Sequence, residues 1–316
     1  MTKLFNFFPS PEKKRGNLIK CINTFANESR KARAYKRKYW NLAVKISAYE
    51  KHRQIELFTD SITYDKFEDI IFFWKETYRF RTSTLESYSG YLSTVLNYFE
   101  RKGYICELSF TDYKFKPDEA NAIYLTTDEV EKIHNLKIKD NTSIIRDLFV
   151  IGSCTGLRYS DYSKLTKANI QSGSITVKTQ KTGAKVILPV HWMVMEIIAR
   201  NGGIIPKLEH SQQNFNKVIK NIAKRAGVNS EVLVERTQGN DRVRKKVKKY
   251  SLVCSHTARR SFATNMYLAG VPTAKIMLCT GHKTEESFFK YIRIGKQENA
   301  KELAEHPFFR KSLLQI

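Results

Sequence analysis

Apolar side chains recur every three or four residues through most of the first hundred positions, and this helical period narrows most strongly what the chain can fold into. Three stretches carry the period, each with one apolar face that can pack against a neighbour. The apolar residues are Tyr39, Leu42, Ala43, Ile46 and Tyr49, then Phe67, Ile70, Ile71, Trp74 and Tyr78, then Leu85, Tyr88, Leu92, Val95, Leu96 and Phe99. The spacing therefore predicts a small helical domain.

The chain has 316 residues, a length that suits about two domains. We expect a flexible basic arm over residues 1–22, because prolines and a run of basic residues interrupt regular structure there. The helical domain then covers residues 23–112. A linker covers residues 113–124, where the helical period is lost around Pro117. Residues 125–316 form a second domain that ends in a C-terminal tail.

The second domain is predicted to be mainly helical with small β-hairpins. Thr126 or Thr127 can cap its first helix, with acidic residues in the first turn. Residues 172–190 alternate in polarity and turn at 181–183, which is typical of a β-hairpin. Residues 232–253 favour a second hairpin with one basic strand. The predicted fold class is thus mainly α, with two domains and small β-hairpins in the second.

The net charge of the chain indicates the kind of partner that it binds. The chain has 55 Lys and Arg against 31 Asp and Glu, a net charge of +24. So many positive side chains repel one another unless a polyanion binds, and nucleic acid is the usual polyanion. No apolar run is long enough for a membrane span. The first predicted helix is rich in basic residues, and we expect three of them to contact the DNA backbone, namely Lys36, Arg37 and Lys38. The alternative is that these side chains are only solvated.

The five cysteines are scattered, and neither zinc spacing nor a phosphate-binding glycine loop is present. We therefore expect no metal and no cofactor. The thiols are typical of a reducing compartment, and the N-terminal stretch is too short for a secretory signal. The expected location is the cytoplasm, in association with the nucleoid.

Five dispersed residues form an ordered set. Arg158 follows a turn into a helix, His256 and Arg259 are three apart and share one helical face, His282 stands after Thr-Gly, and Tyr291 follows nine residues later. Each is common by itself. Together they suit attack on a phosphate, because a tyrosine is about one part in a thousand ionised at pH 7 and needs an electrophile polarised by positive charge.

The segments "TGLRYSDYSKL", "TQKTGAKVILPV", "HTARRSFAT" and "TGHKTEESFFKYI" stand in an order that closely resembles the catalytic domain of the tyrosine recombinases, the lambda-integrase-like site-specific recombinases and integrases. The resemblance covers roughly residues 125–292. It implies that residues 23–112 are a core-binding domain that grips double-stranded DNA. It further implies strand cleavage through a 3′-phosphotyrosyl intermediate and assembly of a homo-tetramer on two recombination sites.

The resemblance also implies the role of each residue. Arg158 and Arg259 would hold the scissile phosphate, His256 would act as general acid/base, His282 would donate a hydrogen bond to the phosphate, and Tyr291 would be the nucleophile. The bond energy is conserved in the protein–DNA link, so rejoining needs neither ATP nor a divalent metal.

Other residues are expected to support these five. Lys181, at the tip of the first hairpin, would protonate the leaving 5′ oxygen, with Lys185 as the competing assignment and Lys178 as a further neighbour on DNA. Asp161 would orient neighbouring groups, because a carboxylate against phosphate would repel. Arg260 would contact a flanking phosphate or an acidic neighbour.

Several alternatives stay open. A type IB topoisomerase shares the chemistry, although His256 favours a recombinase, and a catalytically silent DNA-binding protein is a second alternative. Integration or excision of a mobile element, DNA inversion and resolution of chromosome dimers are not distinguished. The DNA site and any accessory bending or directionality protein are likewise not indicated. The free protein is expected to be a monomer. The tail would dock on a neighbouring subunit by resemblance, or pack within its own.

Overall fold

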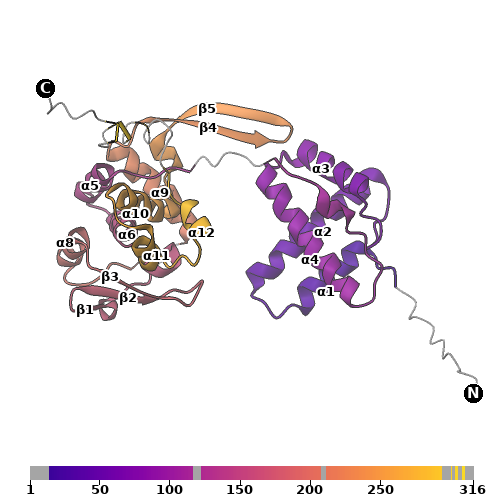
Figure 1. The fold of residues 1–316 in the computed structure, drawn as a ribbon, viewed down its shortest axis with the longest axis horizontal. Helices are drawn as coiled ribbons and strands as arrows, with labels where there is room; N and C mark the ends of the chain where they lie inside the picture. Colours follow the sequence, from indigo (N-terminus) through magenta and orange to yellow (C-terminus); the bar gives the residue numbers. More distant parts are fainter. Residues whose placement is uncertain are drawn as a thin grey trace, which may run out of the picture. The chain divides into compact units, whose positions relative to one another are not determined.

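The computed structural model describes residues 14–116, 122–207, 211–293, 300, 303–304 and 308–309. The chain forms two compact units (Figure 1). The first takes the chain up to Asn121 and adds Val234–Lys245, and the second takes Ala122–Leu233 and everything from Lys246 onward. Across the described part of the chain, no helix has both the length and the apolar character needed to cross a bilayer.

The first unit is a helical bundle. Its elements are α1 (Leu18–Glu28), α2 (Arg33–Arg53), α3 (Tyr64–Tyr78), α4 (Thr82–Arg101) and the short 3-10 helix η1 (Ser109–Asp112). The helices α2, α3 and α4 confirm the three helical stretches predicted from the apolar period, and their apolar faces meet in one core around Trp74, Tyr49 and Phe67. Gly103, at φ +83°, lies just beyond the end of α4.

The predicted arm over residues 1–22 extends too far, because α1 begins inside it. The side chain of Asn17 accepts a hydrogen bond from the backbone N–H of Lys20 at 2.9 Å and so caps the helix. Leu18 and Ile22 are fully buried in the core of the unit. The chain is already held at Lys14, whose carbonyl accepts from the N–H of Ile105 at 2.9 Å. Residues 1–13 of the expected arm lie outside the described residues.

The segment predicted as a linker, residues 113–124, is packed at both of its ends. Tyr113 lies against the core of the first unit, and Ile123 is buried in the core of the second. Both ends pack because they carry apolar side chains, and the first unit covers Tyr113 whereas the second covers Ile123. Pro117, on which the prediction rested, lies outside the described residues.

The second unit is mainly helical with one small sheet. Its helices are α5 (Thr127–Asn135), α6 (Ser143–Thr155), α7 (Tyr159–Tyr162), α8 (Trp192–Arg200), α9 (Gln212–Arg225), α10 (Ser255–Leu268), α11 (Thr273–Thr280) and α12 (Glu285–Phe289), with short 3-10 turns η2 (Lys167–Asn169) and η3 (Lys249–Leu252). Thr126, one of the two predicted caps, closes a capping box with Glu129 at the start of α5. Helix α10 packs along α6 in the middle of this unit (Figure 1).

The first predicted hairpin is confirmed as β2 (Ser174–Lys178) and β3 (Lys185–Pro189), which pair antiparallel. A third short strand, β1 (Ile170–Gln171), joins the edge of β2 and makes a three-stranded sheet. Buried and exposed side chains alternate along β2 and β3, so one face of the sheet lies on the core. The register pairs Lys178 with Lys185 at the end next to the turn.

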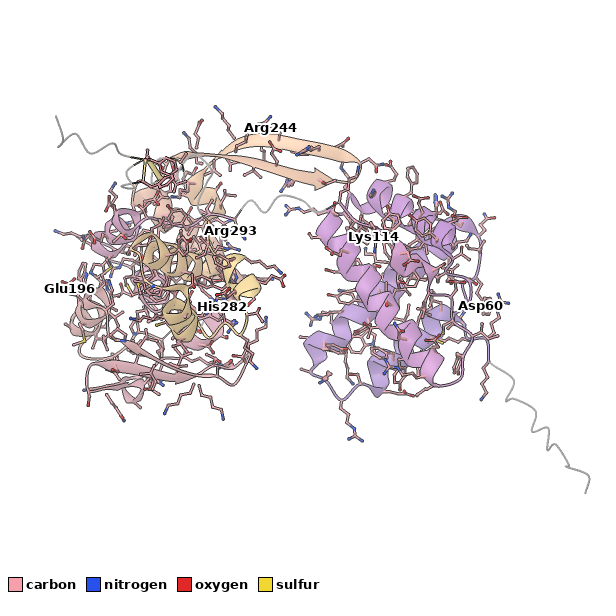
Figure 2. All side chains as sticks on the ribbon, in the orientation of Figure 1. Asp60, Lys114, Glu196, Arg244, His282 and Arg293 are labelled. Atoms are coloured by element: carbon pink, nitrogen blue, oxygen red, sulfur yellow. The ribbon has the colours of Figure 1, made fainter. Side chains whose placement is uncertain are left out.

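The second predicted hairpin is confirmed as β4 (Glu231–Gln238) and β5 (Asp241–Lys248). Exposed cations on β5, among them Arg244 (labelled in Figure 2), pair with glutamates on β4. The tip of this hairpin belongs to the first unit, where the N–H of Gly239 donates to the carbonyl of Phe80 at 3.2 Å and Arg79 pairs with Asp241 at 2.5 Å.

Gly156 ends α6 in the left-handed region at φ +64°, and a Cβ built there would lie 2.4 Å from Cδ1 of Phe262 on α10. We expect Gly156→Ala to lose stability twice over: about 1 kcal/mol from the left-handed backbone and about 1–3 kcal/mol from overpacking. The matched control is Gly202→Ala, at φ +69° with no atom within 4 Å of its Cβ, which carries the backbone strain alone. Chemical unfolding of both variants checks this. Equal losses would contradict the close contact with Phe262.

Candidate active site

Arg158 stands at the turn between α6 and α7, in the N-cap position of α7. The turn is set by Gly156, whose left-handed backbone ends α6, and by the fully buried Leu157. Nη1 of Arg158 is buried and has no hydrogen-bond partner among the residues that the structure describes. A buried N–H donor without a partner is costly, so this guanidinium points to an acceptor that the protein itself does not supply.

Helix α10 carries His256 and Arg259 on one face. Arg259 is only 1 % exposed. Its Nη1 donates to the carbonyl of Gly156 at 2.7 Å, and its Nη2 donates to Nε2 of His282 at 2.9 Å. Its Nε is buried with no hydrogen-bond partner in the described part of the chain. Two of the three guanidinium nitrogens are therefore held by neutral acceptors, which fix its plane without cancelling its charge.

His282 follows the end of α11 and is labelled in Figure 2. Gly281 takes the left-handed conformation at φ +65°, so that its own N–H and that of His282 both donate to the carbonyl of Met277, at 2.8 and 3.2 Å. This helix end aims the imidazole at Arg259. Sequence reasoning made His282 a donor to phosphate; within the protein its Nε2 instead accepts from Arg259.

Tyr291 lies just after α12, and its ring lies close to three other members of the set. Its ring centroid is 4.7 Å from that of His282, 5.1 Å from that of His256 and 5.1 Å from Cζ of Arg259. The hydroxyl of Thr264 on α10 donates to the carbonyl of Tyr291 at 3.4 Å and ties this segment to α10. The structure thus brings the phenol ring to the two histidines and the buried arginine.

The three lysines of the first hairpin are placed differently. Lys181 is exposed at the turn, and its charge lowers the pKa of His256. Lys178 and Lys185 pair in register across β2 and β3, at the end of the strands next to the turn. Asp161, 3 % exposed, accepts at Oδ1 from the N–H of Gln180 at 2.9 Å and so holds the turn that carries Lys181.

Positive charge and burial set the protonation of the two histidines. Burial, with Arg260, Arg259, Arg158 and Lys181 as further causes, lowers the pKa of His256 to about 4. Burial, followed by Arg259 and Arg158, lowers the pKa of His282 to about 3. Both imidazoles are therefore neutral at pH 7.

The arginine beside them keeps its charge. Burial first, and then Arg158, lowers the pKa of Arg259 to about 10, so the guanidinium is still a cation at pH 7. Among the residues that the structure describes, no ion pair includes either arginine. The cluster therefore combines two cations, two neutral imidazoles and a phenol, which is a site for an anion.

Sequence reasoning missed two residues that touch the cluster. Thr280 is fully buried and its hydroxyl oxygen lies 2.8 Å from Nδ1 of His282. Arg293 donates its backbone N–H to Thr264 at 3.2 Å, and the charge of Arg260 lowers its pKa after burial does. Thr280 is the first residue of the segment "TGHKTEESFFKYI" and Arg293 directly follows it, so closeness to that segment was the available signal.

In the first unit, the three predicted DNA contacts lie on α2. Arg37 and Lys38 are exposed, whereas Lys36 is half-buried and donates to the carbonyl of Asn27 at 3.1 Å. Lys38 also borders a groove that the sequence did not indicate. The groove is lined by hydroxyl, amide and phenol groups of α2 and α4, namely Lys38, Asn41, Ser83, Thr84, Ser87, Tyr88 and Tyr91. The hydroxyl-rich start of α4 was the signal that could have found it.

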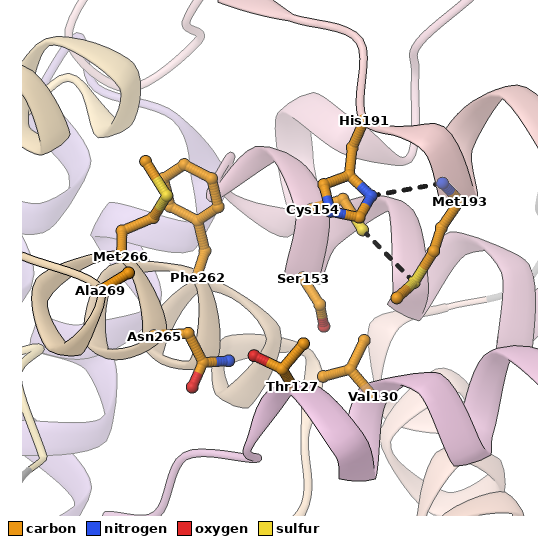
Figure 3. Close-up of a pocket in the computed structure, with 10 residues that line it drawn as sticks. All are labelled: Thr127, Val130, Ser153, Cys154, His191, Met193, Phe262, Asn265, Met266 and Ala269. Carbon is orange, nitrogen blue, oxygen red and sulfur yellow. Dashed lines mark hydrogen bonds between the residues drawn. The ribbon is translucent and has the colours of Figure 1, made fainter. Parts of the chain in front are cut away.

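The second unit also holds a mostly apolar pocket of about 200 Å³ (Figure 3). Cys154, Met193 and Met266 line it, and the thiol of Cys154 lies 4.0 Å from the sulfur of Met193. Phe262 lies between this pocket and Gly156. Neither of the two arginines nor Tyr291 lines it, so it is distinct from the cluster. Within the described residues no three His, Cys, Asp or Glu side chains gather so as to hold a metal ion.

Solved structures share this fold. A lambda integrase fragment crystallised as a dimer bound to a COC′ core site is 15% identical, with a TM-score of 0.64 over 87% of this chain and 94% of that one. The Tn1549 transposon integrase in complex with transposon right end DNA is 14% identical, with a TM-score of 0.64 over 92% and 99%. The site-specific recombinase XerH, bound to a palindromic difH substrate, is 14% identical, with a TM-score of 0.61 over 86% and 79%.

No curated protein matches the chain by sequence. The family model of the phage integrases matches residues 123–298, a span that contains every member of the cluster. Since that match covers more than half of the chain, the protein belongs to the phage integrase family.

Proposed function

We propose that this site-specific DNA recombinase cuts and rejoins DNA strands with Tyr291 as nucleophile and with Arg158 and Arg259 as the groups that hold the scissile phosphate. One observation supports the proposal above the others: the phenol ring of Tyr291 lies within about 5 Å of His256, His282 and the guanidinium of Arg259. A phosphate would satisfy the unpaired buried nitrogens of both arginines.

In the cleavage step, the phenol oxygen of Tyr291 attacks phosphorus and the bond from phosphorus to the 5′ oxygen breaks. A 3′-phosphotyrosyl link and a 5′ hydroxyl result, and the reverse reaction with a second strand rejoins the DNA. The additional negative charge of the transition state falls on the non-bridging oxygens. Arg158 and Arg259 stabilise it there, because planar guanidinium groups can donate two parallel hydrogen bonds to a phosphate.

Two protons move in this step. His256 accepts the proton of the Tyr291 hydroxyl, and its low pKa supports this role because the imidazole is neutral at pH 7 and so able to accept. Lys181 gives a proton to the leaving 5′ oxygen. The hydrogen bond from Gln180 to Asp161 supports Lys181 rather than Lys185 as this donor, since it anchors the turn on the helix that follows Arg158.

His282 donates to the phosphate only when Nε2 carries a proton. The positive charges of Arg259 and Arg158 disfavour this protonation, because they lower the pKa of the imidazole. A bound phosphate offsets both arginines and raises the pKa. We therefore assign His282 two hydrogen-bonding roles, first as acceptor from Arg259 and then as donor to the phosphate.

The first unit is the proposed core-binding domain. Arg37 and Lys38 on α2 contact phosphates, and the hydroxyl and amide groups of the groove between α2 and α4 contact the DNA beside them. Arg260, Lys178 and Lys185 extend the contact from the second unit. The net charge of +24 supports steep salt dependence of binding, since each phosphate contact releases counterions.

Recombination joins two duplexes, so we propose a homo-tetramer on two sites and a monomer before DNA binding. The lambda integrase crystallised as a tetramer on a Holliday junction has the same fold and supports this assembly. An accessory bending or directionality protein is part of the proposal, as is action on DNA in the nucleoid.

Covalent trapping tests the nucleophile. On a nicked suicide substrate carrying the cognate site, the wild-type protein should accumulate a protein–DNA adduct on a denaturing gel, and Tyr291→Phe should form none because the attacking oxygen is gone. Tyr267→Phe is the matched control, since Tyr267 lies on α10 and is 37 % exposed. An adduct in Tyr291→Phe would overturn the assignment.

The same preparation separates the alternatives. Efficient relaxation of a supercoiled plasmid without any cognate site would favour a type IB topoisomerase. Tight site-specific binding without an adduct in the wild-type protein would indicate a catalytically silent DNA-binding protein.

Replacing the arginines by lysine tests the phosphate clamp. Arg158→Lys and Arg259→Lys should each slow adduct formation by a factor of about 10³, because lysine keeps the charge and loses the planar fork. Arg260→Lys, one residue further along α10, should have a much smaller effect. Single-turnover cleavage rates at saturating protein measure this, and equal effects at positions 259 and 260 would contradict the clamp.

The two depressed histidine pKa values predict proton uptake on DNA binding. The pKa values of about 4 and 3 should rise when a bound phosphate offsets the charge of the arginines. At any pH between the original and the raised pKa values, the DNA-bound protein then holds more protons than the free protein. Affinity should therefore increase as the pH falls from about 7 toward 5. Fluorescence anisotropy at constant salt measures it. The double variant His256→Gln and His282→Gln should flatten the slope, and a slope equal to that of the wild type would refute the linkage.

A further inference from the structure

The buried hydroxyl of Thr280 makes a contact that the proposed reaction has not used. Thr280 is the last residue of α11 and is fully buried. Its Oγ1 lies 2.8 Å from Nδ1 of His282 and donates to the carbonyl of Ile276 at 2.9 Å. The contact lies on the side of the imidazole that faces away from Arg259.

Donor and acceptor chemistry decides where the proton of His282 lies. A threonine hydroxyl has one proton, and the carbonyl of Ile276 takes it, so Oγ1 can only accept from Nδ1–H. On the other side of the ring, Arg259 has only donors, so Nε2 must present its lone pair. Both neighbours select the same neutral tautomer, with the proton on Nδ1.

We propose that Thr280 is a positioning residue that holds His282 with its proton on Nδ1, so that Nε2 remains the acceptor that orients Arg259. The role toward the scissile phosphate rests on the proposed function, whereas the hydrogen bonds themselves do not. Arg259 is then fixed between two neutral acceptors, the carbonyl of Gly156 and Nε2 of His282. The plane of its guanidinium is set before DNA binds.

Among the groups around the imidazole, Thr280 supplies the acceptor for Nδ1–H. Arg259 on α10 and Arg158 after α6 are cations, and His256 adds a third group that opposes protonation. The rings of Tyr291 and Phe288 lie beside it, with ring centroids 4.7 and 5.7 Å from that of the imidazole. Without the Thr280 hydroxyl, Nδ1–H would have no acceptor among these groups. The tautomer with the proton on Nε2 would then become competitive, and its N–H would oppose the N–H of Arg259.

The tautomer can be read directly by ¹⁵N NMR of histidine side chains in the full-length protein without DNA. His282→Gln identifies the signals by their loss. In the wild type, Nδ1 of His282 should show the shift of a protonated nitrogen and Nε2 that of an unprotonated one. Thr280→Ser should keep this pattern, because serine retains the hydroxyl. Thr280→Val should lose it, and Thr280→Ala replaces the valine variant if that one does not fold.

Cleavage of the suicide substrate supplies the second measurement. Thr280→Val should slow adduct formation by about tenfold or more, as expected when a histidine loses the partner that sets its tautomer, while Thr280→Ser stays near the wild-type rate. Ser153→Ala is the matched control, since Ser153 is also a buried hydroxyl that donates to a carbonyl four residues earlier, at 3.0 Å.

The outcomes separate the two proposals. Retention of the wild-type tautomer in Thr280→Val, or equal loss of activity in the serine and valine variants, would overturn the role of Thr280. Failure of the wild-type protein to form any adduct would overturn the proposed function instead, and the NMR result would still decide the tautomer.

Discussion

The arrangement of the second unit depends on holding the buried guanidinium of Arg259 close to that of the partly buried Arg158, with no ion pair to either among the residues that the structure describes. An uncompensated buried charge is destabilising by several kcal/mol. Arg259 donates to the carbonyl of Gly156 and to the imidazole lone pair of His282, which orient the guanidinium and leave its charge intact. Burial and Arg158 lower its pKa to about 10, and the cation persists. The fold therefore maintains a concentrated positive charge for an anion to neutralise.

Two glycines make this arrangement possible. Gly156 turns the chain out of α6 so that its carbonyl meets Arg259, and its missing side chain leaves room for Phe262. Gly281 turns the chain out of α11 so that the His282 imidazole reaches the same guanidinium. Both adopt positive φ, where a side chain is strained. The backbone at two helix ends thus positions the charges that would act on DNA.

Much of the fold follows from local pattern. The apolar period over residues 39–99 predicts α2, α3 and α4, since a helix buries one stripe of its surface whatever it packs against. Alternation predicts both hairpins for a similar reason. Helix α1 was missed because prolines and basic residues near it indicate an arm, whereas burial of Leu18 and Ile22 depends on the distant helices that cover them. The predicted linker includes Ile123, whose burial likewise depends on residues far along the chain.

The sequence by itself determined the order of the motifs and the excess of positive charge, because these depend on residue type and spacing alone, and it predicted the five central residues by their resemblance to a known family. Only the tertiary structure decided which hairpin lysine lies near His256, that His282 accepts from Arg259, and that Thr280 stands behind that imidazole. These depend on hydrogen-bond directions between helices far apart in the chain. Spacing along the chain cannot specify such directions, since packing of α6, α10 and α11 sets them.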